Sequence, residues 1–249
     1  MAEFKDYFSD VSGAYARFRP LYPPALFDRL AALTARHDRA WDCATGTGQA
    51  AHGLAAQYSE VIATDASVQQ IAAAIPHPRV RFAVATAEAS GLAEASVDLV
   101  CVAQAAHWFN MVAFNRELQR VLRPGGAAVL IAYKLFTSLP AVDALIAEAY
   151  HGELAKHWAP ERAIIDRDYA DLALDLEPVT LAPAAMHANW SAEQLLGYLE
   201  TWSGIRALNR ADGRDVVAEW APAIKAAWGT GTRPVTWPLI LKAGRKPAA

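Results

Sequence analysis

The stretch Trp41-Asp42-Cys43-Ala44-Thr45-Gly46-Thr47-Gly48-Gln49 begins in a short apolar segment and ends where a helical pattern starts. The apolar segment, Ala40–Cys43, predicts a buried strand, and Gly48–Gln57 is expected to form a helix after a tight glycine turn. The next expected strand, Val61–Asp65, ends in an aspartate 19 residues after Gly46. In a strand–helix–strand unit, a carboxylate at this place accepts hydrogen bonds from ribose hydroxyls. We therefore expect a nucleoside site at this turn.

Strand and helix patterns alternate through the first half of the chain. Further strands are expected at Val80–Val84, Val97–Val102 and Ala127–Tyr133, and helices at Ala25–Ala35, Val68–Ala74 and Phe114–Leu122, the last stopped by Pro124-Gly125-Gly126. The strands are apolar throughout rather than at every second residue, which is typical of parallel strands covered by helices on both faces. The pattern predicts an α/β fold with a doubly wound, mostly parallel, seven-stranded Rossmann-like sheet.

The second half is less regular and rich in tryptophan. Helices are expected at Val142–Ala155 and at Ser191–Thr201, where Ser191 and Gln194 have the spacing of a capping box. Val179–Asn189 and Val235–Lys242 are expected to be extended, and Pro183 restricts the former to an edge or breaks it. Lys134–Leu174 and Ser191–Arg233 are interpreted as insertions that cap the strands. Six of the eight tryptophans lie beyond position 150, so we expect these insertions to form a water-excluding lid.

The composition of the 249-residue chain excludes several classes of protein. With 54% hydrophobic and 20% charged residues the chain can bury a large core, so disorder is excluded. Its 23 basic and 26 acidic residues give a net charge of −3 without a basic run, so no nucleic-acid partner is expected. No apolar run approaches the roughly 20 residues of a membrane span, and we expect a cytoplasmic protein. Cys43 and Cys101 form no CxxC pair, and the seven histidines lack ligand spacing, so we expect no metal.

The residues around the glycine turn do not by themselves identify the nucleoside, which could belong to a dinucleotide or to a cofactor that carries an amino group. Gly46–Ala51 also satisfies a loose dinucleotide pattern, which would indicate a nicotinamide-linked oxidoreductase. Asp42 argues against that alternative, because a carboxylate there repels a pyrophosphate and attracts an amino group. A cofactor-binding module without catalysis is a third hypothesis.

Several stretches spread along the chain resemble one family. They are Tyr15–Pro23 (YARFRPLYP), Asp42–Gly48, Gln104–Phe109 (QAAHWF), Leu195–Ser203 (LLGYLETWS), Trp237–Leu239 and Gly244–Lys246. With them the chain resembles the class I S-adenosylmethionine-dependent methyltransferases, and in particular the branch that includes trans-aconitate methyltransferase. It departs from that branch at Ala44, which replaces the usual first glycine, and at Thr86, which replaces the usual acidic residue before Ala87.

The resemblance implies S-adenosylmethionine as cofactor and a role for each matching residue. The backbone of Gly46 and Gly48 is expected against the amino acid part of the cofactor, with Asp42 near its ammonium group and Gln104 near the methionine moiety. Asp65 is expected at the ribose, and Ala87 and Glu88 at the adenine. The cofactor-binding residues implied in full are Tyr15, Arg19, Asp42, Ala44, Gly46, Gly48, Asp65, Ala66, Ala87, Glu88 and Gln104. Arg19 is a candidate for the cofactor carboxylate, because a guanidinium fork matches a carboxylate.

His107 and Trp108 follow the fourth strand, where ligands bind in open α/β sheets, and are the candidate catalytic residues. His107 is expected either to orient the acceptor, to act as a base, or to cap a turn, and Trp108 to form a pocket wall. Tyr198 and Trp202, four residues apart, either seal the pocket or pin the lid. Arg17, Arg206 and Arg210 are candidate clamps for an anionic acceptor.

The expected activity is methyl transfer to a small molecule, with a carboxylate oxygen as the acceptor. A carboxylic acid with a pKa of roughly 4 is ionised at neutral pH and needs no general base. The alternative is N- or O-methylation of a heterocyclic or phenolic metabolite, for which His107 would be the base. We expect a single domain over residues 1–249, divided into a cap (1–24), a cofactor-binding core (25–133), lid insertions with a late strand (134–233) and a final strand (234–249). A monomer and a homodimer both remain open.

Overall fold

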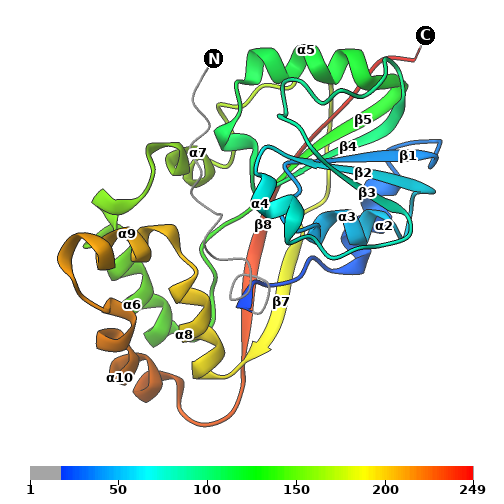
Figure 1. Cartoon of the computed structure of the whole chain (residues 1–249). Coiled ribbons are helices and arrows are strands. Elements are labelled where there is room, and N and C mark those ends of the chain that lie inside the picture. Colours follow the sequence, from blue (N-terminus) through cyan, green and yellow to red (C-terminus); the bar gives the residue numbers. More distant parts are fainter. Residues whose placement is uncertain (1–17, 249) are drawn as a thin grey trace.

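A computed structural model gives the fold of residues 18–248, and the described chain is built around one large sheet (Figure 1). Five strands run parallel in the order β3-β2-β1-β4-β5. They are β1 (Arg39–Cys43), β2 (Glu60–Asp65), β3 (Val80–Val84), β4 (Val97–Ala103) and β5 (Leu122–Tyr133). The chain changes direction across the sheet between β1 and β4, the kind of switch point at which open α/β sheets bind ligands. The predicted α/β sheet is confirmed.

The antiparallel side of the sheet corrects the predicted strand number. β8 (Arg233–Arg245) pairs with β5, and the opposite edge of β8 pairs with two short strands, β6 (Glu177–Val179) and β7 (Ala185–Trp190). The described residues therefore form eight strands where seven were predicted. Pro183 lies between β6 and β7, and because proline has no N–H to donate, the single extended segment expected over Val179–Asn189 is broken there.

Helices cover both faces of the parallel strands, as a doubly wound fold requires. α2 (Pro24–Ala31) and α3 (Gln49–Leu54) bury leucines and alanines against one face, while α5 (Met111–Val121) packs Phe114 and Leu118 against the other. The short α4 (Val68–Ala72) connects β2 with β3. Alternate residues of the central strands feed the two layers: Trp41 faces the α5 side and Ala40 the α3 side.

Four helices gather at one end of the molecule, at the lower left of Figure 1, and are called the lid below. They are α6 (Pro140–His151), α8 (Ala192–Glu200), α9 (Ser203–Asp212) and α10 (Val216–Trp228). The lid has its own core, which includes Trp190, Trp202, Trp228 and Trp237 and is packed by Trp158 and Trp220. The six late tryptophans therefore all belong to or contact this core. Two 3-10 turns, η3 (Ala155–His157) and η4 (Pro160–Arg162), and α7 (Ala163–Asp166) follow α6.

Two element boundaries show how the local sequence determines where a helix begins or ends. Ser191 and Gln194 make both hydrogen bonds of the predicted capping box at the start of α8. α5 ends at Val121, one residue before the predicted end, and Pro124-Gly125-Gly126 belongs to β5 instead of separating the helix from the strand. Leu122 is already extended, with φ −68° and ψ 133°, and a Cβ on Gly126 would lie 2.9 Å from the Arg123 carbonyl oxygen. Glycine at 126 thus permits a close backbone approach inside a strand.

None of the helices in the described range combines the length and the apolar character that crossing a bilayer requires.

Candidate functional site

The turn after β1 is built from residues in the left-handed backbone region. Ala44, Gly46 and Gly48 have φ values of 56°, 57° and 96°. The Thr45 N–H donates to the Thr64 carbonyl oxygen at 2.9 Å, which fixes the turn against β2. A Cβ on Gly48 would lie 2.7 Å from the Phe82 ring, so this position has room only for glycine. The predicted glycine turn is present at the carboxyl end of β1.

Asp65 joins the glycine turn to the loop after β2. Its Oδ2 accepts a hydrogen bond from the Gly46 N–H at 2.8 Å, and its Oδ1 accepts one from the Ser67 N–H at 2.8 Å. The half-buried Asp65 and Ala66 therefore lie beside the turn, as the sequence spacing predicts. This arrangement holds a carboxylate at the edge of the sheet.

Asp42 is fully buried beneath the same turn. Its Oδ2 accepts a hydrogen bond from the Thr45 hydroxyl, whereas its Oδ1 has no hydrogen-bond partner among residues 18–248. Burial raises the pKa of Asp42 to about 7, and the nearby Asp65 adds to this effect. Buried polar atoms are almost always paired in folded proteins, so an unpartnered carboxylate oxygen at a predicted ligand site indicates a cationic ligand group.

The loops after β3, β4 and β5 meet at the same edge of the sheet. Ala87 is buried, and Glu88 accepts a hydrogen bond from the Asn110 N–H at 3.0 Å, which ties the β3 loop to the start of α5. Gln104 has a φ of 59°, and its Oε1 accepts a hydrogen bond from the Tyr133 N–H at 3.2 Å. A strained backbone at such a place is typical of functional sites.

His107 and Trp108 lie on the turn η2 (Ala106–Trp108), directly after β4. His107 is 8% exposed, its ring centre lies 4.9 Å from that of Trp108, and its Nδ1 lies 3.0 Å from the Tyr169 hydroxyl. Burial, with a smaller contribution from the positive charge of Arg162, lowers the pKa of His107 to about 3. The imidazole is therefore neutral at physiological pH.

On the lid side, Tyr198 and Trp202 are buried, with ring centres 5.8 Å apart. The Trp237 Nε1 donates to the Tyr198 hydroxyl at 3.2 Å. These contacts agree with the interpretation that the pair pins the lid to the sheet. Arg19 lies over the Tyr198 ring at 5.4 Å and donates to the Tyr133 hydroxyl and to the Thr201 carbonyl oxygen, so its guanidinium links the lid to the end of β5.

The other candidate residues are dispersed. Tyr15 and Arg17 lie outside the described residues. On α9, Arg206 is half-buried and Arg210 is exposed. No local spacing predicts Tyr133 and Tyr169, whose contacts at the site join segments far apart in the chain, or Arg162, which lies in a 3-10 turn. Across the described range, no group of three His, Cys, Asp or Glu residues is placed to hold a metal ion.

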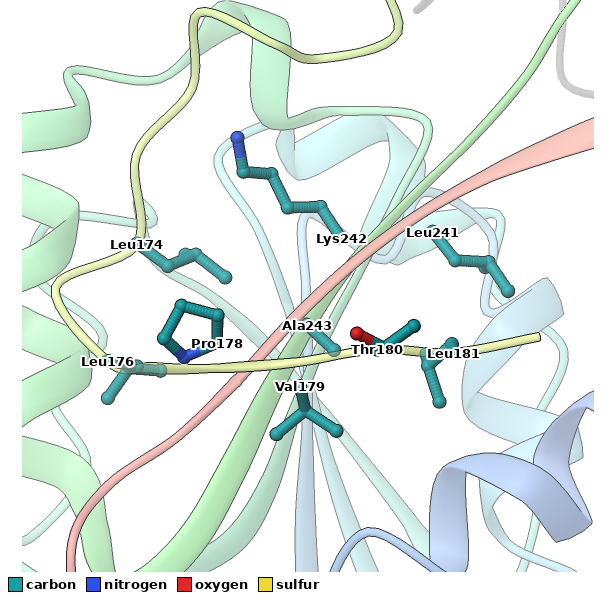
Figure 2. A pocket seen from close by; sticks show the side chains of 9 residues that line it. All are labelled: Leu174, Leu176, Pro178, Val179, Thr180, Leu181, Leu241, Lys242 and Ala243. Carbon is teal, nitrogen blue, oxygen red and sulfur yellow. The ribbon is translucent and has the colours of Figure 1, made fainter. Parts of the chain in front are cut away.

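Two surface hollows lie away from these residues. One, of about 320 Å³, follows β6 and β8 and is lined mostly by leucines and other apolar side chains, with Lys242 at one end (Figure 2). The other, of about 420 Å³, lies between α6 and α10. Neither contains a predicted site residue. The site is therefore defined by the loops after β1 to β5 and not by either hollow.

Comparisons with known proteins agree with this geometry. Residues 41–130 match the family model described as a methyltransferase domain. A protein of Dictyostelium discoideum described as a methyltransferase is 33% identical over 92% of this chain and 88% of its own length. The structure of a protein described as a type II methyltransferase from Anaeromyxobacter dehalogenans has 43% identity and a TM-score of 0.88, over 93% of this chain and 100% of the other. A methyltransferase structure from Bacillus halodurans shares the fold at 19% identity and a TM-score of 0.51.

Proposed function

The chain belongs to the class I S-adenosylmethionine-dependent methyltransferases, and from this premise we propose that it methylates a carboxylate oxygen of a small molecule. The observation that carries the cofactor part of the proposal is the unpartnered Oδ1 of Asp42 beneath the glycine turn. The acceptor part is supported by the state of His107, the candidate base nearest to the end of β4.

The residues at the turn fit the chemical groups of S-adenosylmethionine. The buried Asp42 supplies the negative charge that an ammonium group needs, and such an ion pair relieves the unpartnered oxygen. The Asp65 carboxylate supplies acceptors for ribose hydroxyls. At Gly46 an added Cβ would meet only the Gln70 side chain at 3.7 Å, so a ligand can approach the backbone there. Ala66, Ala87 and Glu88 would border the adenine, and Gln104 the methionine moiety.

The chain's own residues then have to position the acceptor and to shield the reacting atoms from water. When bound, S-adenosylmethionine supplies a methyl group on a positively charged sulfur. Gln104 and Tyr133, joined by a hydrogen bond, hold together the ends of β4 and β5, where the acceptor would approach. The lid core and Trp108 would exclude water from that space. Alignment of the attacking oxygen at about 3–3.5 Å from the methyl carbon is then the main requirement for transfer.

A carboxylate acceptor suits the properties of His107. Its Nδ1 is engaged by Tyr169, its ring is almost fully covered, and its pKa of about 3 makes it a weak base. A phenol, with a pKa near 10, or a protonated amine would need a stronger base to lose its proton. A carboxylate attacks the methyl carbon with its own negative charge, so neutral products form without any proton transfer. N- or O-methylation of a heterocycle or phenol remains the second candidate function.

The domain organisation expected from the sequence is part of the proposal. The two buried layers around the parallel strands support a core over residues 25–133, and the separate tryptophan-rich core supports a lid over 134–233. Membership of the trans-aconitate methyltransferase branch is part of the same proposal. It is supported by the buried Tyr198 and Trp202 and by the turn at His107 and Trp108.

A product assay tests the proposal. The protein is incubated with methyl-labelled S-adenosylmethionine and matched acids, amides and phenols, and the products are then treated with alkali. We expect label that alkali releases as methanol, because methyl esters hydrolyse while phenolic ethers and N-methyl groups do not. Label that stays with the product in alkali would assign the second candidate function. The cofactor part is measured separately, by titrating S-adenosylhomocysteine into the wild type and into Asp42→Asn, which should bind at least about tenfold more weakly.

A further inference from the structure

Arg162 lies between the lid core and the buried layer beneath α5. It ends the turn η4, four residues after Trp158, which packs on the lid core, and three residues before Ile165, which is buried in the layer beneath α5. η4 also contacts η2, the turn that carries His107 and Trp108. The guanidinium charge is close enough to lower the pKa of His107. Arg162 therefore lies at the carboxyl end of β4, beside the proposed site of methyl transfer.

Aromatic rings hold the Arg162 side chain in place. Its guanidinium carbon lies 4.8 Å from the centre of the Trp158 ring and 5.5 Å from that of Tyr150. Its Nε donates to the Tyr150 hydroxyl at 2.8 Å, and that hydroxyl lies 3.0 Å from Asp166 Oδ1. Trp158 in turn packs against Trp202, with ring centres 5.7 Å apart. The rings fix the plane of the guanidinium and leave its two Nη groups at the far end.

Those Nη groups have no partner within residues 18–248. No carboxylate or carbonyl oxygen there accepts a hydrogen bond from them, and Arg162 forms no ion pair. Asp166 is held by the Tyr150 hydroxyl and not by the guanidinium. Arg120 and Arg123, which are similarly part-buried, are paired with the carboxylates of Glu117 and Asp98. A pre-oriented guanidinium fork without a carboxylate partner matches the geometry of an incoming carboxylate.

We propose that Arg162, stacked on Trp158 beside His107, binds a carboxylate of the methyl acceptor and is the main determinant of specificity for acids. The inference rests on the proposed function and adds a residue that the sequence did not indicate. It replaces the lid arginines Arg206 and Arg210 as the expected anion clamp. Arg162 acts by binding, while the transferred methyl group goes to an oxygen of the same or of a second carboxylate.

The test compares Arg162→Gln with the wild type, using monocarboxylic and dicarboxylic acids of three to eight carbons and their primary amides. Acceptor affinity is measured by calorimetry in the presence of S-adenosylhomocysteine, and KM by turnover. We expect affinity for the acids to fall about 10- to 100-fold, which is the range for losing a charge-assisted pair. Affinity for the amides and for S-adenosylhomocysteine should change less than about twofold. Arg167→Gln, an exposed neighbour paired with Asp171, is the matched control and should bind acids like the wild type.

Each outcome decides between defined alternatives. A loss with both monoacids and diacids assigns Arg162 to the reacting carboxylate, and a loss confined to diacids assigns it to a second one; both support the inference. Wild-type affinity for acids in Arg162→Gln, or in Arg162→Leu should the first variant fold poorly, overturns it. If the wild type forms no alkali-labile methyl ester, the proposed function fails and the inference falls with it. If the ester forms and the variant binds acids normally, the inference alone fails.

Discussion

At the scale of single residues, the turn after β1 combines one position that requires glycine with one where glycine is missing. Gly48 cannot carry a side chain, because the Phe82 ring occupies the space of its Cβ. Ala44 adopts the same left-handed region with a φ of 56°, although L-residues with a Cβ are disfavoured there by about 1–2 kcal/mol. The departure from the family pattern noted at Ala44 therefore has a structural consequence, which is local backbone strain.

Replacing Ala44 with glycine should relieve that strain. We expect Ala44→Gly to raise the free energy of unfolding by about 0.5–1 kcal/mol, since the gain in the folded state exceeds the extra freedom of the unfolded chain. Chemical denaturation followed by circular dichroism measures this. Ala63→Gly is the control: Ala63 is fully buried on the extended β2, so that variant should lose stability. A loss of stability in Ala44→Gly as well would contradict the strain interpretation.

Asp42 makes the unliganded protein sensitive to pH in a direction that can be worked out. Its pKa is about 7 in the folded protein, mainly because of burial, and near 3.8 when unfolded. The folded state therefore holds its proton more tightly, and stability should fall as pH rises from about 4 to 7, by an amount of the order of 4 kcal/mol. Asp42→Asn should flatten this part of the profile in thermal unfolding experiments. S-adenosylhomocysteine should also flatten this part of the pH profile, because its ammonium group stabilises the ionised form of Asp42. An Asp42→Asn profile equal to that of the wild type would refute the assignment of this pH dependence to Asp42.

At the scale of elements, what the sequence could predict depended on distance along the chain. The link between Gly46 and Asp65 lies within one strand–helix–strand unit, so local patterns were sufficient to predict it. The capping box of α8 was predictable for the same reason. By contrast, the contact of His107 with Tyr169 spans 62 residues. Arg162 lies only 12 residues after Tyr150, but it stands in a 3-10 turn to which no helix or strand period applies. Packing decides such contacts, and no spacing rule expresses them. α10 was missed as well, since Pro222 inside it suppresses a helical prediction.

The contact between α9 and Trp158 provides an element-scale prediction. Gly204 lies in the first turn of α9, and a Cβ there would lie 2.8 Å from the Trp158 ring. Replacing glycine with alanine normally stabilises a helix by up to about 1 kcal/mol. The sign of the stability change therefore shows whether helix propensity or the packing against Trp158 dominates. We expect Gly204→Ala to lower stability by about 1–3 kcal/mol and to raise the acceptor KM, because the ring that supports Arg162 is displaced.

The readouts for Gly204→Ala are thermal unfolding, acceptor KM and affinity for S-adenosylhomocysteine, which should stay unchanged. Ala211→Ser, at an exposed position of the same helix, is the control and should stay within about 0.5 kcal/mol of the wild type. A more stable Gly204→Ala protein would mean that Trp158 does not pack here as described.

At the scale of the whole molecule, β8 connects two hydrophobic cores. Its first half, with Val235 and Trp237, is buried in the lid core and pairs with β7. Its second half pairs with β5 and contributes Ala243 to a sheet layer. In Figure 1 the strand runs from the lid helices to the far side of the sheet. A single strand thus fixes the lid relative to the carboxyl ends of the parallel strands, while the two cores remain distinct.

Two distinct cores predict that the two ligands protect different parts of the chain from hydrogen exchange. S-adenosylhomocysteine should slow exchange in residues 42–48 and 65–67, whose amides form the glycine turn and the loop after β2. Adding an acid acceptor should slow exchange further in residues 155–170 and in α9, because an acid bound to Arg162 stabilises the segment that packs through Trp158 on α9 and makes its local opening rarer. Mass spectrometry of peptides from the intact protein measures both. In Arg162→Gln the first protection should persist and the second should be lost. If cofactor alone protected both regions equally, the lid would respond to the cofactor rather than to the acceptor, and the assignment of acceptor binding to the lid boundary would be wrong.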